Sequence, residues 1–286
     1  MSRIAFLGLG RMGQPMAGRV LGAGHDLAVW DALAVRRQPL AQAGARAADS
    51  PAAAVAGAEL VISMVADPRA LESVFFGPGG AAPALGPAAL VLEMSTVGPG
   101  AVHDLAARLG PDAQVVDAPV LGSLPEAEAG HLTVMVGASP ANFERVVPVL
   151  AVMGSPRLVG GPGSGAALKL AVNLSLLGVA TALGEAMALA TSLGVEPGVA
   201  AEVISGSPWG SLLRSRWGMI ESGAFPPQLR MGLAVKDLSL IREAAEAAGV
   251  QVPVGRAALT WLEAAQRRFG PDVDFAAVIA EIMRKS

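Results

Sequence analysis

Short apolar segments alternate with helical stretches from the first residues of the chain to about Gly161. Such alternation is typical of a parallel sheet with helices packed against it. Helix starts are marked at Ser50-Pro51 and Ser139-Pro140, where a capping hydroxyl precedes a proline suited to the first turn. The Ala-rich stretch at residues 41–58 is interpreted as helix, strand and helix. The expected strands are Ile4–Leu7, Leu27–Trp30, Leu60–Val65, Leu90–Met94, Val115–Ala118, Leu132–Val136 and Arg157–Val159.

Beyond Gly163 the alternation stops, and helical periodicity continues to the end of the chain. We therefore expect a domain boundary at Gly160–Gly163, with an α/β domain over residues 1–162 and a helical domain over residues 163–286. Gly and Pro are predicted to end the successive helices of the second domain. These breaks lie at Gly194–Pro197, Gly206–Pro208, Gly223–Pro227, Gly249–Pro253 and Gly270–Pro271.

The longest apolar stretch, Ala166–Leu193, contains Lys169, Asn173 and Glu185. These polar residues favour a buried interdomain helix over a membrane span. Lys169 and Asn173 are four residues apart, so they share one face of that helix. Burying an unpaired ammonium is costly, which points this face into a polar cleft. The alternative is a lysine that extends to solvent above a satisfied asparagine.

Composition excludes several classes of protein. A net charge of −3 without a basic run predicts no nucleic-acid partner. The absence of cysteine excludes disulfides and thiolate zinc sites, and His25, His103 and His131 lack the spacing of metal ligands, so no metal is expected. The absence of tyrosine excludes a Tyr-x-x-x-Lys hydride-transfer site. No signal peptide is recognised at the N-terminus, and a cytoplasmic protein without a membrane association is expected.

The first apolar segment runs directly into Gly8-Leu9-Gly10-Arg11-Met12-Gly13. In a Gly-x-Gly-x-x-Gly turn, the first glycine permits the turn, the second lets a pyrophosphate approach the backbone, and the third allows close packing of the following helix. Asp31 follows the second expected strand, 18 residues after Gly13, where a ribose-binding carboxylate belongs. This pattern predicts a bound dinucleotide.

Asp31 also bears on which dinucleotide is bound. Its carboxylate would accept from the ribose hydroxyls and repel a 2′-phosphate, so NAD is favoured over NADP. NADP remains an alternative, because Arg36 or Arg37 could reach its 2′-phosphate. The simpler interpretation is that both arginines lie on a helix face exposed to solvent.

With these motifs, the chain resembles the β-hydroxyacid dehydrogenase family. That family includes 3-hydroxyisobutyrate dehydrogenase, tartronate semialdehyde reductase and the glyoxylate/succinic semialdehyde reductases. The resemblance implies an N-terminal Rossmann domain and a C-terminal all-α domain joined by a long interdomain helix. It also implies oxidation or reduction of a small molecule. Independently, the long apolar helix from Gly165 and the helical second domain expose more apolar surface than one small domain can cover, which predicts a homodimer or homotetramer. Five motifs carry it: the turn and helix start at residues 8–17, Glu93–Val97, Asp117–Ser123, the Lys169–Asn173 helix, and Lys236-Asp237-Leu238.

The resemblance also implies roles for individual residues. Lys169 resembles the catalytic lysine that exchanges a proton with the substrate oxygen while a hydride moves to or from the nicotinamide. The implied substrate-binding residues are Ser95, Gly122, Ser123, Asn173, Lys236 and Asp237. The implied cofactor-binding residues are Gly8, Leu9, Gly10, Arg11, Met12, Gly13, Asp31, Met64, Val65, Thr96 and Lys236.

Two departures from the family pattern leave the substrate open. The family usually has Ser where this chain has Leu121, and binders of 3-hydroxyisobutyrate often have Asn where it has Val172. Leu121 gives some support to a non-catalytic dinucleotide-binding sensor or assembly protein. An imine reductase-like enzyme is a further alternative, against which Lys169 argues. His131 is a conceivable base that ranks below Lys169 because no acidic partner is evident.

Overall fold

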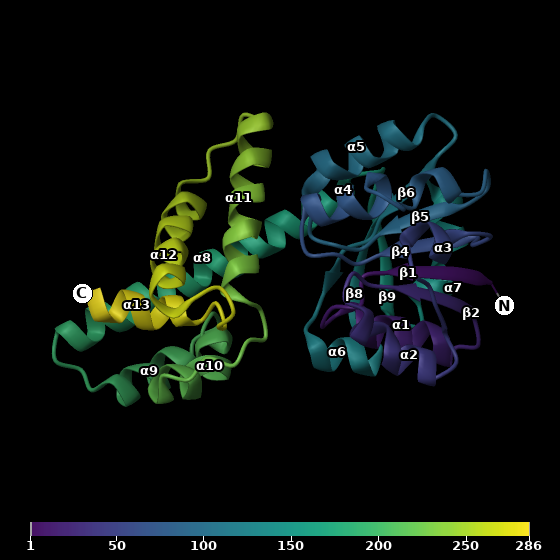
Figure 1. The fold of residues 1–286 in the computed structure, drawn as a ribbon. Helices are drawn as coiled ribbons and strands as arrows, with labels where there is room; N and C mark the ends of the chain where they lie inside the picture. Colours follow the sequence, from purple (N-terminus) through teal and green to yellow (C-terminus); the bar gives the residue numbers. More distant parts are fainter. Residues whose placement is uncertain (1, 286) are drawn as a thin grey trace. The chain divides into compact units, whose positions relative to one another are not determined.

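The structure is a computed structural model that describes residues 2–285. The chain divides after Lys169 into two compact units, of which the first contains a sheet and the second is helical (Figure 1). We call them the α/β unit and the helical unit. The predicted boundary at residues 162 and 163 lies a few positions before this division, in the loop that precedes the long helix.

One sheet of nine strands occupies the described part of the α/β unit. Its strand order is β3-β2-β1-β4-β5-β6-β8-β7, with β9 beside β8. The seven predicted strands are confirmed, whereas the two-residue β7 was not predicted. β8 runs antiparallel to β6 and β7, so this edge departs from the parallel pairing of β1 to β6. The strands are β1 (Arg3–Leu7), β2 (Asp26–Trp30), β3 (Arg46–Ala47), β4 (Leu60–Ser63), β5 (Leu90–Glu93), β6 (Gln114–Asp117), β7 (Val120–Leu121), β8 (Leu132–Gly137) and β9 (Gly154–Gly160).

Each face of the sheet packs against its own layer of helices, because successive side chains of a strand point to opposite faces. In β1, Ile4 and Phe6 belong to one core, whereas Ala5 and Leu7 belong to the other. The first core includes α1 (Gly13–Gly22), α2 (Gln38–Gln42), α6 (Leu124–Ala129) and α7 (Pro140–Leu150). The second includes α3 (Pro51–Val55), α4 (Pro68–Phe76) and α5 (Gly98–Leu109). Two short 3₁₀ helices lie at Ala34–Arg37 and Ala82–Ala84.

The predicted helix starts are confirmed. The Ser50 hydroxyl accepts from the backbone N–H of Ala53 at 3.1 Å, and the Ser139 hydroxyl accepts from that of Asn142 at 3.2 Å. The Ala-rich stretch contains the end of α2, then β3 and α3, in the predicted order.

The helical unit is built around α8 (Ser164–Ser192), which begins in the α/β unit. This helix is long and apolar enough to cross a bilayer by length and composition alone. Its buried side chains, among them Leu177, Leu183 and Met187, nevertheless belong to the core of the helical unit. The later helices are α9 (Pro197–Ser205), α10 (Ser211–Ser222), α11 (Met231–Ala247), α12 (Pro253–Phe269) and α13 (Ala277–Lys285). The predicted breaks lie between successive helices, although α10, α11 and α13 begin a few residues after them.

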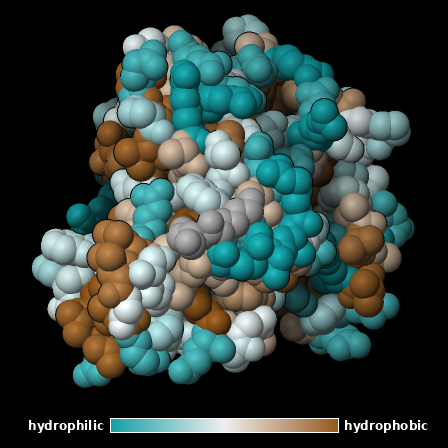
Figure 2. Space-filling model, turned by 90° about the vertical axis from the view of Figure 1, so that its left-hand side faces the viewer, coloured by the Kyte–Doolittle hydropathy of each residue, from teal (hydrophilic) through white to brown (hydrophobic). Residues whose placement is uncertain are grey.

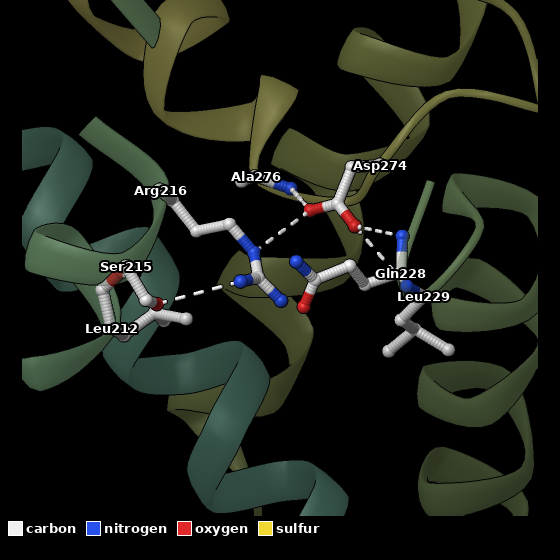
Figure 3. Close-up of polar contacts among 7 residues, drawn as sticks. All are labelled: Leu212, Ser215, Arg216, Gln228, Leu229, Asp274 and Ala276. Atoms are coloured by element: carbon white, nitrogen blue, oxygen red, sulfur yellow. Dashed lines mark hydrogen bonds and ion pairs between the residues drawn. The ribbon is translucent and has the colours of Figure 1, made fainter. Parts of the chain in front are cut away.

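The buried carboxylate of Asp274 holds the loop that precedes α11. Asp274 is fully buried and accepts from the backbone N–H groups of Gln228 at 2.7 Å, Leu229 at 3.1 Å and Ala276 at 3.1 Å (Figure 3). The Nε atom of Arg216, on α10, forms an ion pair with it at 3.3 Å. The loop before α11 is thereby joined to α10 and to the loop before α13.

Candidate active site

Four neighbouring parallel strands end at one edge of the sheet, and predicted cofactor- and substrate-binding residues follow those ends. Gly8 follows β1, Asp31 follows β2, Met64 follows β4 and Ser95 lies two residues beyond β5. The carboxyl edge of such a sheet is where doubly wound proteins bind ligands. Backbone hydrogen bonds join these segments: the N–H of Gly8 donates to the carbonyl of Trp30 at 2.8 Å, and that of Met64 donates to the carbonyl of Leu7 at 2.9 Å.

The glycine turn has the geometry of a phosphate cradle. Gly8 has a φ of +99°, and a Cβ there would lie 2.3 Å from the Met64 carbonyl oxygen. A Cβ on Gly13 would lie 2.0 Å from the Gly8 carbonyl oxygen, so α1 packs closely against the turn. A Cβ on Gly10 would meet no atom within 4 Å, so the space above this backbone is open. The three glycines therefore fit the pyrophosphate of a dinucleotide.

Asp31 is buried beside this turn. One of its oxygens accepts from the backbone N–H of Leu9 at 2.7 Å, and the other accepts from that of Leu33 at 2.8 Å. Each carboxylate oxygen can accept a second hydrogen bond, so Asp31 can also receive the ribose hydroxyls. The Arg36 guanidinium lies 3.5 Å from Asp31. Arg37 is directed elsewhere, to the carbonyl of Ala48 and the carboxylate of Asp49.

A buried acid organises the ends of β4 and β5. The carboxylate of Glu93 accepts from the Ser63 hydroxyl and, at 2.8 Å, from the backbone N–H of Ser95. The Ser95 hydroxyl oxygen then accepts from the backbone N–H of Val65 at 2.8 Å. Ser95 is only 2% exposed, whereas the neighbouring Thr96 is half-buried. Ser95 thus shapes the loop, and Thr96 is the more accessible of the two hydroxyl groups.

The carboxylate of Asp117, at the end of β6, holds the start of α8. It accepts from the backbone N–H groups of Gly163 and Ala166, each at 2.7 Å. Burial raises the pKa of Asp117, although backbone N–H donors, first among them that of Ala166, oppose this shift. Gly137 makes room for the carboxylate, because a Cβ there would lie 2.4 Å from it. Lys169 is half-buried on α8, three residues after Ala166.

The loop at residues 120–123 was expected to hold a substrate carboxylate. Leu121 is 46% exposed, and Gly122 has a φ of +138°. Both polar groups of Ser123 are engaged: its N–H and its hydroxyl donate to the Glu126 carboxylate at 2.7 and 2.6 Å. These bonds, with that from the Ser123 hydroxyl the largest influence, lower the pKa of Glu126. Glu126 therefore stabilises the fold above its unfolded-state pKa, and this contribution is lost as the pH falls through its native pKa.

Three predicted residues meet inside the helical unit. The Asn173 side-chain amide donates to the carboxylate of Asp237 at 2.7 Å, and the Lys236 ammonium lies 2.9 Å from the other oxygen of that carboxylate. Asn173 and Asp237 are 5% and 3% exposed. The amide nitrogen of Asn173 therefore faces Asp237, which orients the Asn173 side chain.

Sequence reasoning did not identify Glu93, Asp117 and Glu126 as organising residues. Glu93 and Asp117 had a readable signal, since each is an acid at the end of an apolar strand, where burial demands hydrogen-bond partners. Glu126 could have been found from its spacing, because an acid three residues after a serine at the start of a helix is typical of a capping box. His131 is exposed, and no cluster of three or more candidate metal ligands occurs among the described residues.

Two family patterns match successive parts of the chain. Residues 3–162 match the NAD binding domain of 6-phosphogluconate dehydrogenase. Residues 163–282 match the NAD-binding domain of NADP-dependent 3-hydroxyisobutyrate dehydrogenase. The chain belongs to the 3-hydroxyisobutyrate dehydrogenase, or β-hydroxyacid dehydrogenase, family. It is an NAD(P)-dependent oxidoreductase with the Rossmann sheet and all-helical C-terminal domain of that family.

Relatives from several bacteria share this family's architecture but differ in substrate. The chain is 36% identical to the NAD-dependent L-serine dehydrogenase of Pseudomonas aeruginosa, over 97% of both chains. It is 32% identical to the 3-sulfolactaldehyde reductase of Escherichia coli, over 99% of this chain and 96% of the relative. The structure of Mycobacterium tuberculosis 3-hydroxyisobutyrate dehydrogenase with L-serine is similar, with a TM-score of 0.87, 30% identity and 98% coverage of both chains. Membership of the family therefore gives the reaction class and leaves the substrate open.

Proposed function

We propose that this β-hydroxyacid dehydrogenase transfers a hydride between a nicotinamide cofactor and a small β-hydroxyacid or the matching semialdehyde, with Lys169 as the proton donor and acceptor. The observation that supports this most is the hydrogen bonding of Asp117. The sheet edge that carries the glycine turn also fixes the helix on which Lys169 lies. The test is a panel of short hydroxyacids and semialdehydes, assayed with NAD and NADP by nicotinamide absorbance.

The residues of this chain have separable tasks in the proposed reaction. When bound, the nicotinamide supplies or accepts the hydride. In reduction, the Lys169 ammonium stabilises the developing negative charge on the substrate oxygen and donates a proton to it. In oxidation, the neutral amine accepts the hydroxyl proton. Asn173, oriented by Asp237, offers its amide oxygen to the substrate hydroxyl.

A second candidate function is dinucleotide binding without turnover. The exposed Leu121, in place of a hydroxyl donor, favours it. Lys169, Asn173 and Lys236, which would have no task in a sensor, oppose it. Stoichiometric NAD binding together with no turnover across the panel would support this second function.

NAD is the preferred cofactor in this proposal. We expect kcat/KM to be higher with NAD than with NADP, because the Asp31 carboxylate repels a 2′-phosphate. Asp31→Asn should narrow the preference by removing that charge. Arg36→Ala should widen it, since Arg36 is the cation beside Asp31. Steady-state kinetics with both cofactors on the three proteins provide the check, and a wild-type preference for NADP would contradict the assignment.

The active protein is a homodimer or homotetramer in this proposal. Hydrophobic residues form patches among hydrophilic ones on the face shown in Figure 2. The end of α8, α9 and the loops around them have several exposed apolar side chains, which favours a protein partner. They are Leu189, Leu193, Val195, Val199, Val203 and Trp209. Light scattering at micromolar concentration should give a multiple of 28.7 kDa, and a monomer alone would refute the proposal.

A cytoplasmic location without membrane association stays a prediction.

A further inference from the structure

The Glu93 carboxylate links the ends of two neighbouring strands. β4 ends at Ser63 and β5 ends at Glu93, and these two residues are partners in the sheet. The Ser63 hydroxyl donates to one oxygen of the carboxylate, and the backbone N–H of Ser95 donates to the other at 2.8 Å. The Ser95 hydroxyl oxygen accepts from the N–H of Val65 at 2.8 Å. With the backbone, these three bonds close a ring through Ser63, Glu93, Ser95 and Val65, which we call the Glu93 ring.

The Glu93 ring is shielded from water. Ser63, Glu93 and Ser95 are all buried. Hydrogen bonds are stronger in such surroundings, and a buried donor that loses its acceptor is costly. The ring uses only groups of the protein, so it holds the segments Met64–Val65 and Ser95–Thr96 together independently of a ligand.

One of these segments also supports the glycine turn. A Cβ on Gly8 would lie 2.3 Å from the carbonyl oxygen of Met64 and 3.3 Å from the Cγ1 atom of Val65. Because the contact is this close, a displacement of Met64–Val65 would also displace the turn to which we assign the pyrophosphate. The Glu93 ring thus acts on the cofactor site through the glycine turn and through Thr96.

We propose that Glu93 is a positioning residue for the dinucleotide: it holds both segments in the arrangement that binds the cofactor, without touching the cofactor itself. Without the ring, fewer molecules are in that arrangement, which raises the Kd in proportion and leaves the bound complex unchanged. This inference rests on the proposed function, which assigns the cofactor to the glycine turn, Met64, Val65 and Thr96.

The test measures cofactor binding and kinetics in two variants of Glu93. NADH is titrated calorimetrically without substrate, and KM for NAD and kcat are measured with a substrate found in the panel. Glu93→Ala should raise the Kd for NADH and the KM for NAD about tenfold, as expected if about a tenth of the molecules are ready to bind. Its kcat at saturating NAD should stay near the wild-type value.

Glu93→Gln should restore most of the affinity. Its amide oxygen can accept from the N–H of Ser95, and its amide nitrogen can donate to the Ser63 hydroxyl, which accepts as well as donates. The ring is then complete without the charge. Equal losses of affinity in Glu93→Gln and Glu93→Ala would trace the effect to the charge and overturn the inference.

Glu59→Ala is the matched control, and Ser63→Ala is the second variant. Glu59 is an exposed acid just before β4, at the opposite end of that strand from Ser63, so its loss changes the net charge equally and should leave the Kd at the wild-type value. Ser63→Ala removes one bond of the ring and should raise the Kd about twofold or more. Should Glu93→Ala not fold, Ser63→Ala serves for the same comparison.

Two further results would overturn the inference. One is a wild-type Kd for NADH in Glu93→Ala, or in Ser63→Ala where that variant replaces it. The other is a lower kcat with an unchanged KM for NAD, which would indicate a smaller fraction of active protein. Because NADH binding is measured without substrate, a panel without turnover would refute the proposed function while the titration still decides the role of Glu93.

Discussion

Replacing Lys169 with alanine should lower kcat by two or more orders of magnitude. The variant has no group at this position to donate a proton to the substrate oxygen or to accept one from it, and general acid–base catalysis contributes about 10²–10⁴ in rate. NAD affinity should change little, because the proposal assigns the pyrophosphate to the glycine turn and the ribose to Asp31, not to Lys169. Turnover and NAD binding are measured on the same preparation, so that loss of folding is distinguished from loss of chemistry.

Two further variants sharpen this prediction. Lys169→Arg should restore little activity, because a guanidinium keeps its proton too tightly to serve as a base. His131→Ala, which removes the other candidate base, should leave kcat near the wild-type value. Near-normal turnover in Lys169→Ala, with a large loss in His131→Ala, would transfer the proton-transfer role to the histidine.

Replacing Asp117 with alanine should cost about 2 kcal/mol or more in the free energy of unfolding of the α/β unit. The change leaves the buried N–H groups of Gly163 and Ala166 without their acceptor, and each unsatisfied donor costs about 1–3 kcal/mol. Release of a buried charge offsets part of this loss. Because the start of α8 is then less fixed, Lys169 is less well positioned and kcat should fall as well.

Asp117→Asn and Asp104→Ala provide the comparison. The asparagine of Asp117→Asn retains one acceptor oxygen, so the free energy of unfolding of this variant should lie between those of the wild-type protein and Asp117→Ala. Asp104 is an exposed acid on α5, and its removal should shift stability by no more than about 0.5 kcal/mol. Denaturant unfolding monitored alongside kcat tests both effects. An Asp117→Ala protein as stable as Asp104→Ala would show that this carboxylate does not stabilise the start of α8.

The periodic features of the sequence predicted most of the fold. Seven strands, the helical second half and the capped starts at Ser50 and Ser139 follow from local rules, because strand and helix periods and capping residues act over a few positions. The two-residue β7 had no such pattern. Its pairing with β8 depends on where the chain returns after β6, which is a long-range property.

The candidate site was predictable in its residue types and less so in its hydrogen bonds. The turn at Gly8–Gly13 and the acid at Asp31 form a motif with fixed spacing. The contacts of Glu93 with Ser63 and of Asp117 with Gly163 join positions 30 and 46 residues apart. Such pairs are set by strand order, so a single sequence does not reveal them. The Ser123–Glu126 pair is local, because the two residues are three positions apart at the start of α6.

Deuterium transfer tests the central claim most directly. Each alcohol of the substrate panel that supports turnover is prepared with deuterium on its carbinol carbon, and the nicotinamide product is examined by NMR. The account predicts that the deuterium is found on C4 of the reduced nicotinamide in the wild-type protein, at a rate at least about 100-fold lower in Lys169→Ala. Absence of deuterium from that carbon, or absence of turnover across the whole panel, would contradict it.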